Sequence, residues 1–243
     1  MPETVVVLSV WGSPAATAYL KTISAIPNLR IRPVFEKNEK IFADIQRIFE
    51  ERFSATAPRF APPEVSGAVL PPVMIEKLQS EETLKTIAAL EPDWMVLAGS
   101  GIVKEPLLKI PRRGTLNCHP GILPRYRGCT CVEWALFEDE PVGATCHFVT
   151  PEIDAGDIVR KKTLPVFTGE TYRDLRLRMF YFCAELMAES LHLLVNDPEQ
   201  AQSGMERFDW EKSRYYKPIP AEQMEEVLLK IGQGSYRHLQ SLP

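Results

Sequence analysis

Short, largely apolar runs that alternate with helical patterns constrain the fold of this chain more than any other feature. Such runs lie at residues 5–10, 29–36 and 94–98, and all three are rich in Val, Ile or Leu. Apolar residues at helical spacing occur at 15–26 and 81–90. Strands that are apolar on both sides and alternate with helices are typical of parallel sheets. The sequence therefore predicts an α/β fold with a mostly parallel sheet and helices on both faces.

The rest of the chain extends this pattern and ends in a more polar segment. Its 243 residues suit one large domain, which we expect to span residues 1–200. Residues 201–243 form a short C-terminal extension, too small for an independent domain. Further strands are expected at 73–75, 114–118, 143–149 and 158–166. Further helices are expected at 40–53, 171–195 and 221–231, and the Pro-rich segment 58–72 is expected to cross the surface.

Composition and charge exclude several classes of function. The net charge of −4 gives no general attraction for nucleic acid, and no apolar run is long enough to span a bilayer. The first residues lack the features of a signal peptide, and the five cysteines form no CxxC pair. Cys129 and Cys131 form only a CxC without a second cluster, so no metal site is expected. These features predict a cytoplasmic protein without nucleic-acid or membrane partners, and apolar C-terminal helices compatible with a homodimer.

Three polar residues stand where predicted strands end. Asn117 and His119 lie two positions apart at the end of one strand, and Asp154 follows another. Positions two apart on a strand face the same side, so the amide and the imidazole can point into one crevice. Together with a carboxylate they can stabilise an oxyanion and move a proton at an acyl carbon. A structural histidine at a strand end is the alternative interpretation of this spacing alone.

The surrounding motifs narrow this interpretation. Asn117-Cys-His-Pro, Leu123-Pro, Arg127-Gly128 and Asp154-Ala-Gly156 follow one another in the order found in the formyltransferase family, which the chain resembles over about residues 90–170. Gly12-Ser13-Pro14 is similar to a Gly-Thr-Pro turn in the methionyl-tRNA and sugar branches of that family. The resemblance implies a Rossmann-like sheet and N10-formyltetrahydrofolate as the formyl donor, without a metal.

The resemblance also implies roles for particular residues. Asn117, His119 and Asp154 match the catalytic residues of the family: the first two would stabilise the oxyanion, and Asp154 would orient His119 and accept the amine proton. Two loops, 99–103 and 149–154, match the folate pocket. The residues expected to contact the donor are Gly101, Ile102, Val103, Leu123, Thr150 and Ile153.

The acceptor amine is less constrained by the sequence. The turn after the first strand offers few free backbone donors for the phosphate of a glycinamide ribonucleotide, and the chain shows no basic stripe for tRNA. The favoured acceptor is a nucleotide-linked amino sugar, contacted by the extension. Alternatives are phosphoribosylglycinamide or another small amine, hydrolysis of the donor, and a catalytically silent folate-binding relative. The residues expected to bind the acceptor are Gly12, Ser13, Arg125, Arg127, Trp210 and Tyr216; His147 is expected to be structural.

Overall fold

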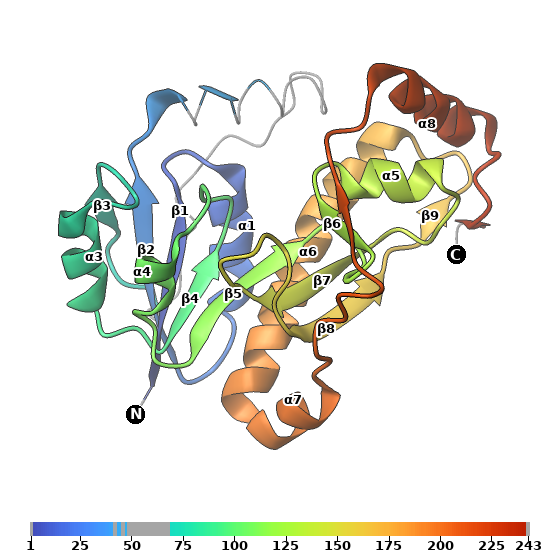
Figure 1. Ribbon diagram of the computed structural model, residues 1–243. Coiled ribbons are helices and arrows are strands. Elements are labelled where there is room, and N and C mark those ends of the chain that lie inside the picture. The colour runs from blue at the N-terminus through green and yellow to red at the C-terminus, as the bar shows by residue number, and fades with distance from the viewer. Residues whose placement is uncertain (1, 41–42, 45–46, 48–68, 242–243) are drawn as a thin grey trace.

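A seven-stranded sheet forms the centre of the protein. The computed structural model describes residues 2–40, 43–44, 47 and 69–241 (Figure 1). Most of the predicted helix at 40–53 and most of the Pro-rich segment 58–72 lie outside these residues. The strand order is β3-β2-β1-β4-β5-β7-β8. The strands are β1 (Glu3–Val10), β2 (Leu29–Glu36), β3 (Val73–Ile75), β4 (Trp94–Leu97), β5 (Gly114–His119), β7 (Gly143–Phe148) and β8 (Ile158–Thr163).

The direction of the strands changes at β5. From β3 to β5 all neighbours pair in parallel, whereas β7 runs antiparallel to β5 and β8 antiparallel to β7. The prediction of a mostly parallel α/β sheet is confirmed. The predicted strand at 158–166 divides into β8 and β9 (Val166–Phe167). Pro165 stands at the break, and it has no N–H with which to continue a ladder.

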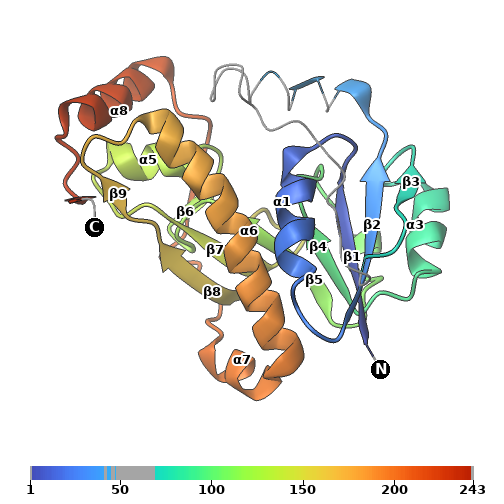
Figure 2. The same ribbon diagram turned by 180° about the vertical axis from the view of Figure 1, so that it is seen from behind.

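Helices cover both faces of the sheet, as predicted. Val5 and Val7 of β1 point into a core shared with α1 (Pro14–Ile23) and α6 (Tyr172–Asn196), which Figure 2 shows crossing the rear face. Val6 and Leu8 point to the opposite face, where α3 (Glu81–Ala88) and α4 (Glu105–Leu108) lie. This alternation follows from the period of two in a strand.

Local sequence determines where the long helices begin. Thr171 and Asp174 form a capping box at the start of α6, in which each side chain accepts from the backbone N–H of the other residue. Pro14 occupies the first position of α1, where a missing N–H costs nothing. Within the described residues no helix is both long and apolar enough to cross a membrane.

The C-terminal extension packs along the body of the protein. β10 (Arg214–Tyr216) pairs in parallel with β6 (Tyr126–Gly128), and α8 (Ala221–Gln233) packs on α5 (Cys131–Phe137) (Figure 1). β11 (Leu239–Gln240) pairs with β9. Residue 200 lies inside α7 (Pro198–Gly204).

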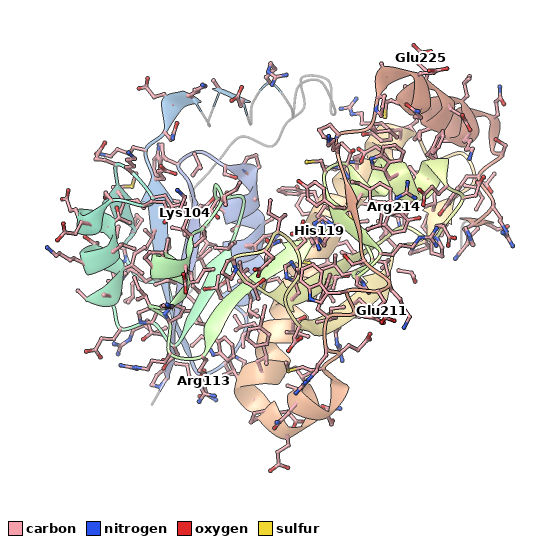
Figure 3. The ribbon with its side chains drawn as sticks, in the orientation of Figure 1. Lys104, Arg113, His119, Glu211, Arg214 and Glu225 are labelled. Carbon is pink, nitrogen blue, oxygen red and sulfur yellow. The ribbon has the colours of Figure 1, made fainter. Side chains whose placement is uncertain are left out.

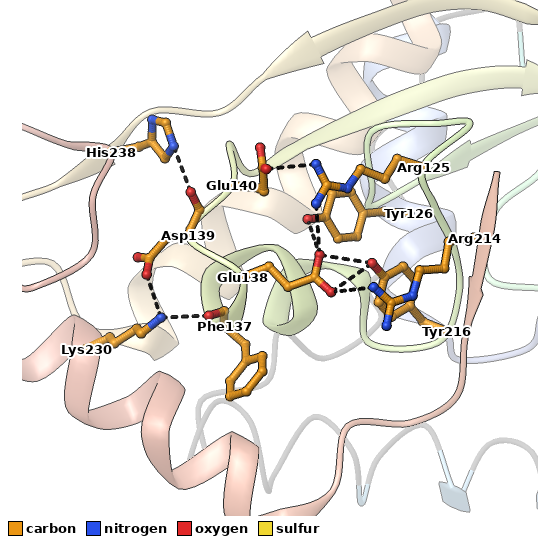
Figure 4. A network of polar contacts seen from close by, with 10 residues as sticks. All are labelled: Arg125, Tyr126, Phe137, Glu138, Asp139, Glu140, Arg214, Tyr216, Lys230 and His238. Carbon is orange, nitrogen blue, oxygen red and sulfur yellow. Dashed lines mark hydrogen bonds and ion pairs between the residues drawn. The ribbon is translucent and has the colours of Figure 1, made fainter. Parts of the chain in front are cut away.

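One carboxylate joins the extension to the body. Glu138, just after α5, accepts hydrogen bonds from the hydroxyls of Tyr126 and Tyr216, at 2.8 and 3.0 Å (Figure 4). The guanidinium groups of Arg125 and Arg214 reach the same carboxylate, at 3.2 and 3.0 Å. Tyr126 and Tyr216 also stack, with ring centroids 5.2 Å apart. Glu138 therefore pairs with two cations and satisfies two buried hydroxyls at this junction.

Candidate active site

Antiparallel pairing of β5 with β7 brings a second histidine to the predicted site. In the register Asn117 lies opposite His147, and His119 lies opposite Thr145. Side chains of directly opposed residues lie close together on one face of a sheet. Figure 3 shows His119 near the middle of the molecule, where β5 ends.

Asp154 lies between the two imidazoles. Its Oδ2 is 3.4 Å from Nδ1 of His119, and its Oδ1 is 3.7 Å from Nε2 of His147. The backbone N–H of Gly128 donates to Oδ2 at 3.1 Å. Asp154 has φ 49°, a left-handed conformation that Asp adopts more readily than most residues. The structure thus brings Asn117, His119 and Asp154 together, as the sequence predicts, and adds His147.

The side chain of His119 is buried and lies against Asp154. Its Nε2 lies 2.9 Å from the carbonyl oxygen of Tyr126, and its Nδ1 faces Asp154. Both ring nitrogens therefore face oxygen acceptors, so a proton on either nitrogen has a partner. A doubly protonated ring would donate at both positions and would place a positive charge beside Asp154.

His147 is buried and fixes the orientation of Asn117. Burial lowers the pKa of His147 to about 4, against the opposing effect of the Asp154 charge. Its Nδ1 lies 2.8 Å from the carbonyl oxygen of Phe148, which can only accept, so Nδ1 carries the proton. The lone pair of Nε2 then faces Nδ2 of Asn117 at 3.4 Å. Neutral His147 accepts a hydrogen bond from the Asn117 amide.

The low pKa of His147 predicts a pH-dependent stability. An unfolded histidine has a pKa near 6.5, so below that pH protons favour the unfolded chain. The contribution of neutral His147 to the free energy of unfolding is complete above about pH 6.5 and is lost as the pH falls from there through about 4. It amounts to about 3 kcal/mol at most. We expect His147→Gln to lose less stability than the wild type between these values, measured by denaturant unfolding at both ends. Equal losses in the two proteins would contradict this assignment.

A cavity of about 260 Å³ opens beside these residues. The two loops predicted to hold the donor, 99–103 and 149–154, line it together with Asn117, His147 and Asp154. His119 does not line this cavity. Gly101, Ile102, Val103, Thr150 and Ile153 lie on the cavity wall, whereas Leu123 is fully buried and lies outside it.

The cavity wall suits a planar heterocycle with polar edges. Ile102 and Ile153 are 74% and 43% exposed, so apolar side chains stand at the mouth without a covering partner. Ser100 lies on the same wall, and its buried hydroxyl has no hydrogen-bond partner within the described chain. Apolar walls with a few unpaired polar groups are typical of small-molecule sites.

The residues expected to bind the acceptor are divided between several places. Ser13 is buried, and Gly12 turns the chain after β1 with φ 82°. Arg125 is paired with Glu138 and Glu140. Tyr216 is 3% exposed, so its ring cannot stack on a ligand.

Arg127 and Trp210 do lie together. The guanidinium carbon of Arg127 is 5.0 Å from the centroid of the Trp210 ring and 5.5 Å from that of Tyr215. Tyr215 is exposed, unlike its neighbour Tyr216. The sequence does not show which of Tyr215 and Tyr216 is exposed, because the two rings lie on opposite faces of one short strand.

His147 is the residue of the site that the sequence interpretation missed. Alternation along β7 places Thr145 and His147 on one face, and this signal is visible in the sequence. The sequence does not show which residues lie opposite that face, because this depends on the antiparallel pairing of β7 with β5.

Solved structures with a similar fold include formyltransferases of two kinds. A sugar N-formyltransferase from Shewanella aligns over 94% of this chain and 87% of its own, with a TM-score of 0.62 and 18% identity. A phosphoribosylglycinamide formyltransferase from Bacillus halodurans aligns over 82% of this chain and 98% of its own, with a TM-score of 0.58 and 18% identity. At these identities the likeness concerns the fold.

Sequence relatives point to the same family. The methionyl-tRNA formyltransferase of Parabacteroides distasonis is 32% identical over 133 residues, covering 54% of this chain and 41% of the relative. That of Citrifermentans bemidjiense is 31% identical over 171 residues, covering 68% and 53%. The chain spans about half the length of these curated relatives. The family model described as formyl transferase matches residues 45–191, more than half of the sequence, so the chain belongs to the formyl transferase family.

Proposed function

We propose that this protein transfers the formyl group of N10-formyltetrahydrofolate to a primary amine. One observation supports this most directly: Asn117 and Asp154 lie on the wall of the same cavity that the loops 99–103 and 149–154 enclose. An amide donor, a carboxylate and an apolar slot thus meet at one place. The catalytic unit would comprise residues 1–200, and the extension would contribute to acceptor binding.

The donor would lie along the two loops. Ile102 and Ile153 offer apolar contact to a pterin ring, while Ser100 and the loop backbone offer hydrogen bonds to its edge. When bound, this co-substrate supplies the formyl carbon that the amine attacks. The proposed chemistry requires no metal ion, because the amide, the imidazole and the carboxylate supply charge stabilisation and proton transfer.

Each polar residue would have a separate role. The Asn117 amide, oriented by His147, would donate a hydrogen bond to the formyl oxygen as negative charge develops there. Asp154 would accept the proton that the amine loses, and the bond between the formyl carbon and N10 would break, with N10 taking up a proton so that tetrahydrofolate leaves. His119, in contact with Asp154, would hold that carboxylate in place.

The favoured acceptor is an amino sugar linked to a nucleotide. A relative of the same fold is described as a sugar N-formyltransferase, although others are phosphoribosylglycinamide and methionyl-tRNA formyltransferases. In this chain Trp210 and Arg127 lie close together at the surface, an aromatic ring beside a cation. This pairing suits a base and a phosphate better than it suits a simple amine.

Incubation with the formyl donor and a panel of amino-sugar nucleotides tests the proposal. We expect tetrahydrofolate to be released in proportion to a formylated amine, with a mass gain on the sugar. Glycinamide ribonucleotide and the free amino sugar serve as comparison acceptors. Release of tetrahydrofolate at the same rate without any acceptor would identify a hydrolase, and no turnover at all would identify a silent relative.

Two further expectations concern the cell. All five cysteines are free, which agrees with a reducing compartment, and we propose a cytoplasmic location. Leu228 and Leu229 of α8 are exposed, and the homodimer stays a prediction. Light scattering over a range of concentrations would test it.

A further inference from the structure

Three aromatic rings surround one arginine at the junction of β6 and β10. The guanidinium carbon of Arg127 lies 5.0, 5.5 and 6.0 Å from the ring centroids of Trp210, Tyr215 and Phe208. We call these four residues the Arg127 cluster. Trp210 is 57% exposed and Tyr215 is 48% exposed, so each ring has a surface open to solvent. Exposed apolar surface of this kind, rimmed by a charged group, is typical of binding surfaces.

Arg127 lacks the carboxylate partner that its neighbours have. Arg125 and Arg214 both pair with Glu138, whereas Arg127 forms no ion pair within the described residues. Asp209, close in sequence to Trp210, is paired with Lys212. Nη1 of Arg127 donates to the hydroxyl of Ser213 at 3.2 Å, but its buried Nε has no partner in the described chain. The cluster therefore holds a positive charge that is not neutralised by the protein.

The cluster also adjoins the catalytic carboxylate. Gly128 follows Arg127, and its N–H donates to Asp154 at 3.1 Å. Tyr215 pairs with Arg127 across the strands, and its ring lies against Gly128, where an added Cβ would be 2.8 Å from Cε2. The aromatic rings and Asp154 therefore contact adjoining residues of β6, the rings at Arg127 and the carboxylate at Gly128.

We propose that the Arg127 cluster is the subsite for the nucleoside diphosphate portion of the acceptor. Trp210 and Tyr215 stack on the base, and Arg127 pairs with the diphosphate. This assignment rests on the proposed function and names the residues that recognise its acceptor. Stacking contacts accept any base, because every base has a π-face. The subsite therefore binds uridine, thymidine and guanosine diphosphates with affinities within about tenfold of one another.

Isothermal titration of the folate-free protein with uridine diphosphate tests the subsite. Trp210→Ala should weaken binding of both uridine and uridine diphosphate by roughly 5- to 100-fold, the usual loss for a stacked base. Arg127→Gln should abolish the preference for the diphosphate over uridine and flatten the salt dependence of binding. Thymidine and guanosine diphosphates are titrated in the same way to measure base tolerance.

A matched control separates stacking from a general loss of an exposed ring. Tyr181, on α6, is exposed to a similar degree as Tyr215, and Tyr181→Ala should leave nucleotide affinity unchanged. Thermal unfolding of each variant shows whether the extension is still folded. Equal losses in Trp210→Ala and Tyr181→Ala would overturn the assignment, as would wild-type protein that binds none of the three diphosphates.

The outcome is distinguishable from failure of the proposed function. If the diphosphates do not bind but a small amine is formylated, the subsite is wrong and the formyltransferase activity stands. If the diphosphates bind and depend on Trp210 and Arg127 but no formyl transfer occurs, the subsite stands and the activity is wrong. The titration contains no formyl donor, so neither result depends on the other.

Discussion

Replacing Asp154 with Asn is expected to lower kcat for formyl transfer by about 10²- to 10⁴-fold. Asn has nearly the same shape, and its amide oxygen can still accept from the N–H of Gly128. It cannot take up the amine proton, and it removes the negative charge that faces His119. The loss should therefore fall on the chemical step. Single-turnover kinetics with a saturating donor would measure it.

A neighbouring carboxylate supplies the control for this experiment. Asp157 belongs to the same loop, but its side chain accepts from the backbone of Phe208 and contacts neither imidazole. Asp157→Asn should retain most of the wild-type kcat. For Asp154→Asn the KM for the donor should change much less than kcat. A variant that turned over at the wild-type rate would remove Asp154 from the mechanism.

Replacing Glu138 with Ala is expected to reduce the free energy of unfolding by about 2–4 kcal/mol. The change leaves the hydroxyls of Tyr126 and Tyr216 without their acceptor, and it leaves Arg214 without its counter-ion and Arg125 with Glu140 alone. Burial and the Glu138 charge both raise the pKa of Tyr126, so its hydroxyl stays protonated and requires an acceptor. Denaturant unfolding at neutral pH measures the loss.

Glu140→Ala is the matched control for Glu138→Ala. Among the described residues the Glu140 carboxylate forms an ion pair with Arg125 alone, at 2.7 Å, and both side chains are well exposed. Exposed pairs contribute about 0–1 kcal/mol, so this variant should be close to the wild type. Limited proteolysis should also cut Glu138→Ala sooner within the extension. Equal stability of the two variants would mean that Glu138 does not hold the extension in place.

The sheet could be predicted from the sequence because its central strands are buried on both sides. The predicted strands at 29–36 and 73–75 coincide with β2 and β3, those that match β1, β4, β5 and β7 differ by one or two residues at their ends, and the one at 158–166 divides into β8 and β9. The direction of β7 was not accessible, since a run of apolar residues has no direction. Helices α4, α5 and α7 are too short to show a helical period, and none of them was predicted.

The site was accessible where its signal is local. Asn117 and His119 are two positions apart on one strand, and the loops around the cavity carry recognisable motifs. The positions of Arg125 and Tyr216 depend on Glu138, which is remote in sequence from Tyr216. No local sequence pattern predicts such a partner. Contacts between segments far apart in the sequence therefore determine which of the candidate arginines and tyrosines remain available to a ligand.

The parallel pairing of β10 with β6 has a consequence for the order of folding. It joins residues 126–128 to residues 214–216, and contacts between such distant segments form late because a large loop must close first. Synthesis delivers the N-terminal part of the chain earlier. Asn117, His119 and Asp154 are therefore all present before the strand that lies beside Gly128 arrives. A newly made chain is expected to bind folate before it can bind its acceptor.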